Sequence, residues 1–120
     1  FLHGAALGKA ILASLPRDRV DEIIDRRGLP ALTANTITDR EVLFDELDRI
    51  AERGVAFDDQ ERLNGLRSAA VPITDEDDAV LGAISLAGPT NRVQDERFRE
   101  TFPAKLSDIK DVIQLDLTYS

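Results

Sequence analysis

The residues GVAFDDQERLNGLRSAAVPITDEDDAVLGAISLAGP, Gly54 to Pro89, are expected to form the whole sheet of this chain. They predict a short strand, an acidic loop and two longer strands. Leu66–Ile73 and Val80–Ala87 are apolar runs of strand length, and the polar run from Thr74 to Asp78 between them is typical of a loop. We therefore expect an antiparallel hairpin whose loop is longer than two residues.

Side chains alternate between the two faces of a strand, and one face of each long strand carries mainly small residues. Those residues are Leu66, Ser68 and Ala70 in the first strand, and Ala83, Ser85 and Ala87 in the second. If both small faces lie on the same side, a space lined by hydroxyl groups remains above them, which indicates a ligand cavity. The alternative is a helix that packs closely there and needs Ala and Ser beneath it.

The helical spacing of apolar residues predicts helices both before and after the sheet-forming segment in the sequence. The segments are Gly4–Leu15, Arg17–Arg27, a helix to about Arg53 that begins with the capping box Thr38–Glu41, and Ala104–Leu117. Asn91–Glu100 is also helical in tendency, and Phe102–Pro103 either interrupts it or restarts it with Pro in the first turn. Three helices, three strands and a final helix indicate an α+β fold with helices covering an antiparallel sheet.

Two finer expectations concern individual helical residues. Gly8 inside the first helix costs stability relative to Ala, which indicates close approach of another backbone segment. In the helix that ends near Arg53, the residues expected to face inward are Val42, Leu43, Leu47, Ile50 and Ala51.

Composition excludes several function classes. The chain has 120 residues and a net charge of −8, so its own surface would repel the phosphates of a nucleic acid. It has no cysteine, which excludes disulfides and thiol chemistry, and no apolar run of membrane-spanning length. We expect one domain in the cytoplasm, without a membrane partner.

The charged residues are biased as well. Asp outnumbers Glu by 15 to 8, and Arg outnumbers Lys by 12 to 3, a pattern expected of a salt-adapted, halophilic cytoplasm. The alternative is an ordinary acidic domain from a GC-rich genome. The abrupt start at Phe1 and the thin sheet lead us to expect a missing N-terminal part.

Catalytic motifs are sparse. His3 is the single histidine, and we expect it to be a surface or structural group rather than a metal ligand. Asp58, Asp59 and Glu61 could form a cation or acid–base site, but an exposed acidic loop explains them equally well. Lys9 could neutralise an anion, although a surface ion pair is the commoner role. The N–H groups in the first turn of the first helix, Gly4 to Leu7, are suited to bind a carboxylate.

Five blocks in order resemble the IclR family of transcription regulators. They are LHGAALGKAILA (Leu2–Ala13), GLPALTANTITD (Gly28–Asp39), RGVAFDDQE (Arg53–Glu61), GLRSAAVPI (Gly65–Ile73) and GAISLAGPTNR (Gly82–Arg92). The resemblance covers nearly the whole chain. It implies a GAF-like effector-binding domain, residues 1–120, incomplete at its N-terminus, whose DNA-binding winged helix-turn-helix domain is absent from this chain.

The resemblance also implies site residues for a small effector. Backbone N–H groups come from Ala6 and Leu7, an acid from Asp58, and further contacts from Leu66, Ser68, Ser85 and Ala87. A serine is common in the family at the position of Ala87, and a smaller residue at that of Leu7. Both departures make the pocket tighter or more apolar.

We therefore interpret the chain as a ligand-sensing and oligomerisation domain, not an enzyme, without cofactor or metal. Its expected partners are a small organic or aromatic acid, further copies in a dimer or tetramer, and DNA through the missing domain. The alternative is a structural dimerisation module with a vestigial pocket. A hydrolase built on Asp58 and His3 is disfavoured because no nucleophile–base pair is recognisable.

Overall fold

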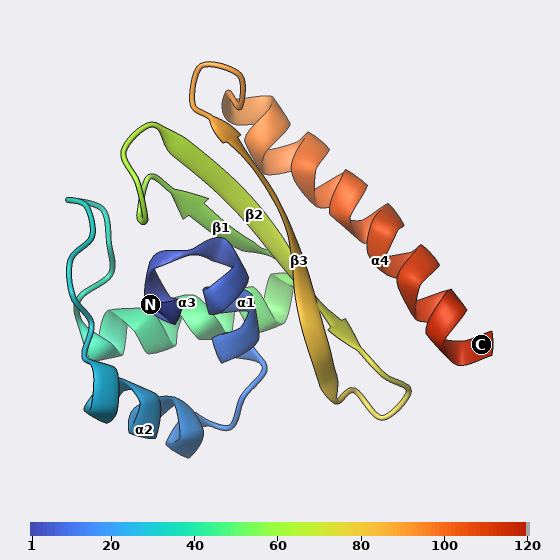
Figure 1. Cartoon of the computed structure of the whole chain (residues 1–120), viewed down its shortest axis with the longest axis horizontal. Helices are drawn as coiled ribbons and strands as arrows, with labels where there is room; N and C mark the ends of the chain where they lie inside the picture. The colour runs from blue at the N-terminus through green and yellow to red at the C-terminus, as the bar shows by residue number, and fades with distance from the viewer. Residues whose placement is uncertain (120) are drawn as a thin grey trace.

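The computed structural model describes residues 1–119, and its helices and strands follow the predicted order (Figure 1). They are α1 (Ala6–Ala13), α2 (Arg17–Arg27), α3 (Arg40–Arg53), β1 (Ala56–Asp59), β2 (Leu66–Thr74), β3 (Val80–Pro89) and α4 (Phe102–Tyr119). A 3₁₀ turn, η1 (Leu2–Gly4), precedes α1, and a π-helical turn, η2 (Arg97–Thr101), precedes α4. The α+β class with an antiparallel sheet is confirmed.

The sheet has the order β1-β2-β3, and both pairings are antiparallel. Ser68 lies opposite Ala87 and Ala70 opposite Ser85, so the small faces of the two long strands do lie on the same side. The central strand tolerates Pro72 because the pairing with β1 ends at Ala56–Ala70, and the missing N–H therefore costs no bond on that side.

Helices cover both faces of the sheet (Figure 1). Helix α1 lies on the small face, with α2 and α3 beyond it, and these elements share a core that includes Ala10, Leu43, Ile50 and Ala70. Helix α4 lies on the opposite face, where Leu106 packs against a second apolar cluster. The acidic site candidates therefore belong to the α1 side of the molecule.

The first helix is shorter than predicted, because Ala5 is extended, with φ −139° and ψ 151°, and separates η1 from α1. The close approach expected at Gly8 is confirmed. A Cβ atom there would lie 2.1 Å from the carbonyl oxygen of Leu2, so only glycine lets η1 fold back on α1.

Helix α3 corrects two further expectations. Its N-cap is Asp39 and not Thr38, since the Asp39 carboxylate accepts a hydrogen bond of 3.0 Å from the N–H of Val42. Val42 and Ala51 are exposed rather than inward-facing, because the stripe of α3 that meets the core consists of Leu43, Phe44, Leu47 and Ile50.

Of the two alternatives expected at Phe102–Pro103, the interruption is wrong and the restart is confirmed, because α4 begins at Phe102 with Pro103 in its first turn and continues directly from η2. The wider π-helical turn immediately before Phe102 accommodates Pro103, which has no N–H to donate. The amphipathic prediction for α4 is correct only in part, because Leu106 is buried while Ile109, Val112 and Leu117 are exposed. None of the helices in residues 1–119 combines the length and apolarity that a membrane crossing requires.

Candidate functional site

The sheet brings the predicted polar residues of three strands onto one face. Asp58 in β1 lies opposite Ser68 in β2, and Ser68 lies opposite Ala87 in β3. Ser85 is two residues from Ala87 along β3, on the same face. A carboxylate and two hydroxyl groups thus share the surface on which α1 packs.

Asp58 is the most buried polar group of this face, with 1% of its surface exposed. One carboxylate oxygen accepts a hydrogen bond of 2.7 Å from the N–H of Glu61, and the other accepts one of 3.1 Å from the hydroxyl of Ser68. Burial raises the pKa of Asp58 above its ordinary value, and these two bonds oppose that rise. The carboxylate is therefore held in one orientation by both neighbouring segments.

Helix α1 supplies the opposite side of the candidate site. Its N-cap, Ala5, makes no side-chain hydrogen bond, and the N–H groups of Ala6, Leu7 and Gly8 have no acceptor within the helix. Ala6 is fully buried, whereas Leu7 is 40% exposed. The first turn of α1 thus offers donors to an anion, as the sequence predicts, but begins at Ala6 rather than at Gly4.

The two interpretations of the small residues apply to different parts of the face. Ala56 and Ala70 are fully buried under α1, so there the small side chains serve close packing. Ser85 and Ala87 on β3 are exposed, and Leu66 is half-buried. A hydroxyl-bearing edge therefore remains open beside α1, and a ligand pocket at this place stays a prediction.

Lys9 contradicts the expectation of a surface ion pair, because its side chain is fully buried. The ammonium group donates to the carbonyl oxygen of Phe57 and, at 2.8 Å, to a carboxylate oxygen of Glu61. It also lies 4.0 Å from Glu46 of α3, which pairs with Arg53. Helical spacing could have revealed this position, since Lys9 stands three residues after the buried Ala6.

The acids Asp58, Asp59 and Glu61 do not act as one cluster. Asp59 pairs with Arg67 at 2.9 Å, which lowers the pKa of Asp59, while Glu61 pairs with Lys9. Burial raises the pKa of Glu61. The expectation of an exposed acidic loop is therefore wrong for Asp58, which is buried, and for Glu61, which is largely buried. Within the described residues, no group of three or more His, Cys, Asp or Glu side chains could hold a metal ion.

His3 is a structural group. Its side chain is buried, and its Nε2 atom lies 2.9 Å from the carbonyl oxygen of Pro30, within hydrogen-bonding distance. Within the described residues, His3 contacts Pro30, whereas Asp58 is bonded to Glu61 and Ser68.

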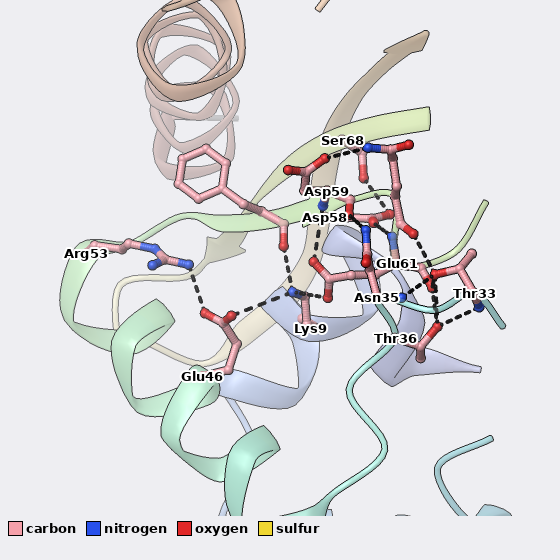
Figure 2. A network of polar contacts seen from close by, with 12 residues as sticks. Lys9, Thr33, Asn35, Thr36, Glu46, Arg53, Asp58, Asp59, Glu61 and Ser68 are labelled. Carbon is pink, nitrogen blue, oxygen red and sulfur yellow. Dashed lines mark hydrogen bonds and ion pairs between the residues drawn. The ribbon is translucent and has the colours of Figure 1, made fainter. Parts of the chain in front are cut away.

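The loop from Gly28 to Asp39 fixes the segment after β1, a contact that the sequence did not reveal. Thr33 and Thr36 donate their hydroxyl groups to the carbonyl oxygens of Gln60 and Glu61, respectively. Asn35 donates to the carbonyl oxygen of Asp59 at 3.1 Å. Figure 2 shows these three side chains beside the segment that follows Asp58. The loop thus orders the turn that carries the buried carboxylates.

Comparison with known proteins defines the class. Residues 1–114 match the family model described as "Bacterial transcriptional regulator IclR C-terminal". The transcriptional repressor IclR of Escherichia coli is 36% identical over 111 residues, covering 92% of this chain and 40% of that protein. A probable regulator, ArcR of Halobacterium salinarum, is 31% identical, covering 97% of this chain and 44% of that protein.

A solved structure agrees with this assignment. The inducer-binding domain of an Acinetobacter PobR double mutant, in complex with 3-hydroxybenzoic acid, superposes with a TM-score of 0.89 and 26% identity. The match covers 94% of this chain and 65% of that one.

The fold and the family model together define an effector-binding domain of a transcription regulator, a class that is not enzymatic. The chain belongs to the IclR C-terminal domain family. It spans 40 to 44% of the length of the two regulators named above.

Proposed function

We propose that this domain binds a small organic or aromatic acid between the first turn of α1 and the polar face of the sheet. The ligand carboxylate accepts hydrogen bonds from the N–H groups of Ala6 and Leu7. Ser68 and Ser85 contact its polar groups, and Asp58 accepts a hydrogen bond from a ligand hydroxyl. The apolar remainder lies against Leu66 and Leu7, and beside Ala87.

The observation that carries this proposal is the buried, doubly bonded Asp58 carboxylate on the sheet face that α1 covers, together with the start of α1, which has no side-chain cap. A packing interface alone would not need an acid at this place, because burial of a carboxylate costs free energy. The PobR domain bound to 3-hydroxybenzoic acid supports an aromatic acid as one candidate ligand.

In the full-length protein, ligand binding changes the relative placement of domains in a dimer or tetramer and so alters DNA affinity. The size of that effect is set by the difference in ligand affinity between the two arrangements. DNA contacts come from the remainder of the protein, since this domain is strongly acidic. This role places the protein in the cytoplasm.

Salt adaptation is a separate proposal that rests on the Asp-rich, Lys-poor composition. The Halobacterium relative agrees with it, but the Escherichia coli repressor is at least as similar to this chain. The comparisons therefore do not favour a halophilic source.

A thermal-shift screen of acetate, pyruvate, lactate, benzoate and 3-hydroxybenzoate tests the function. A ligand at 100 times its Kd stabilises the folded state by about 2.7 kcal/mol, which raises the melting temperature by several degrees. The rival function is a dimerisation module with a vestigial pocket, favoured by the close packing of α1 on Ala56 and Ala70. If no acid stabilises the protein at millimolar concentration, the rival holds.

Ser85→Asp provides the mutational test. The new carboxylate places like charge at the open edge of the site, so we expect at least a tenfold loss of affinity for any acid found in the screen. Since Ser85 is exposed, the fold should be retained. Ser107→Asp, at an exposed position on α4, is the matched control and should bind as the wild type does. Unchanged calorimetric affinity of Ser85→Asp contradicts the proposed site.

A further inference from the structure

Lys9 links four segments through one buried ammonium group (Figure 2). From α1 it reaches the main chain of β1 at Phe57, Glu61 in the following turn, and Glu46 of α3. Two of these three contacts are close hydrogen bonds, and Glu46 already has Arg53 as a partner at 3.0 Å. The position of Glu61 is thus the one that depends most on Lys9.

Glu61 connects this ammonium group to Asp58. One Glu61 carboxylate oxygen is held by Lys9, and the other accepts a hydrogen bond of 3.1 Å from the N–H of Asp59. The N–H of Glu61 itself donates to Asp58. Glu61 is therefore anchored by Lys9 through its side chain, and it orients the Asp58 carboxylate through its main-chain N–H.

Lys9 is also bonded to the start of α1, because its own N–H donates to the carbonyl oxygen of Ala5 at 2.9 Å. The free N–H groups of Ala6 and Leu7 belong to that same turn. Asp58 on the sheet and the donors on the helix are the two sides of the candidate site. Lys9 is the buried side chain that joins them.

We infer that Lys9 is a positioning residue, which sets the distance and orientation between the Asp58 carboxylate and the first turn of α1. The inference rests on the proposed function, since it takes these groups as the two sides of the effector site. An ammonium group suits the task because it donates in three directions from a flexible stem. Lys9 does not touch the ligand in this arrangement.

The test compares two variants of the full-length protein, Glu61→Gln and Lys9→Met/Glu61→Gln. Gln retains a carbonyl oxygen that can accept from Lys9, and Glu46, 4.0 Å away, remains as the carboxylate partner of the ammonium group, so the single variant keeps the link. The double variant removes the donor and leaves no unpaired buried carboxylate at residue 61, so its fold should survive. Lys105→Met/Glu100→Gln, at two exposed positions, is the matched control.

Two measurements follow. Hydrogen exchange at the amide of residue 61 reports on its bond to Asp58, and calorimetry with 3-hydroxybenzoate, benzoate and pyruvate reports on the site. Relative to Glu61→Gln, we expect at least tenfold faster exchange and at least tenfold weaker binding in the double variant. The melting temperatures of the two variants should differ by only a few degrees. A merely structural role of Lys9 would not combine lost affinity with a nearly unchanged melting temperature.

Equal affinity and equal exchange in the two variants overturn the inference. If no acid binds the wild type, the proposed function fails, and exchange at residue 61 alone decides the role of Lys9: faster exchange supports it and unchanged exchange overturns it. If the double variant does not fold, Lys9→Gln in the Glu61→Gln background takes its place. Gln donates through a shorter side chain than Lys, so this variant must also show faster exchange at residue 61 and weaker binding. Exchange and affinity equal to those of the wild type contradict the inference.

Discussion

At the scale of single residues, the site depends on buried charges that are each matched by a specific partner. Lys9 is paired with Glu61, and Asp58 is held by the Glu61 N–H and the Ser68 hydroxyl. Burial raises the pKa values of Asp58 and Glu61 even so, which means that ionisation of these acids opposes folding. The protein thus retains acids whose ionisation opposes folding, as expected if they serve the proposed binding role.

Glu61 has a pH-dependent effect on stability whose sign is set by this raised pKa. Its pKa in the folded state lies above the ordinary 4.5 of a free glutamate. Protonated Glu61 therefore favours folding fully below about pH 4.5, and this contribution is lost as the pH rises through the folded-state pKa. The unfolding free energy of the wild type minus that of Glu61→Gln should fall as the pH increases from 4 to 7.

Urea denaturation of both proteins across this range measures the difference. Asp59→Asn is the control of opposite sign, because Arg67 lowers the pKa of Asp59. The unfolding free energy of the wild type minus that of Asp59→Asn should rise with pH. The rise begins below the folded-state pKa of Asp59 and is complete above 3.8, the ordinary pKa of an aspartate. A difference for Glu61→Gln that rises with pH contradicts the account.

At the scale of helices and strands, α1 is the element on which the site depends. Gly8 lets η1 approach its backbone, and Ala10 lets the helix lie close to Ala70 of the sheet. The small residues of the sheet therefore have two roles: those under α1 provide close packing, and those nearer the β3 edge leave Ser85 exposed. A helix with larger inward side chains would lift its first turn away from Asp58.

The start of α3 offers a direct test at this scale. Asp39 caps the helix, whereas the preceding Thr38 makes no such bond to the helix start. We expect Asp39→Ala to destabilise the protein by about 1 kcal/mol, and Thr38→Ala to have a much smaller effect. Chemical denaturation of the two variants measures this, and a larger loss for Thr38→Ala would show that the capping box begins one residue earlier.

At the scale of the whole molecule, one sheet separates two apolar cores, and the ionisable side chains that are buried among the described residues, His3, Lys9 and Asp58, belong to the α1 side. The candidate site thus lies on one face, and α4 covers the other (Figure 1). The strong acidity of the chain agrees with the proposed function, in which this domain itself does not contact DNA.

The sequence predicted features that depend on local patterns. The bounds of α2 match the prediction, and so does the alternation of small residues along β2 and β3, whereas the register that puts both small faces on one side comes from the fold. The sequence did not predict the ion pair between Lys9 and Glu61, because the two residues are 52 positions apart and come close only in the folded chain. Exposure of Val42 and continuity through Pro103 likewise depend on tertiary packing and helix geometry rather than on spacing.

The most direct test of the central claim is a crystal structure of the protein with the acid that stabilises it most in the screen. We expect electron density for the ligand between α1 and the sheet, with its carboxylate within hydrogen-bonding distance of the N–H groups of Ala6 and Leu7, and its other end near Ser85. Density elsewhere, for example in the surface hollow lined by Phe1 and Ile23, with the face around Asp58 unchanged, would contradict the account.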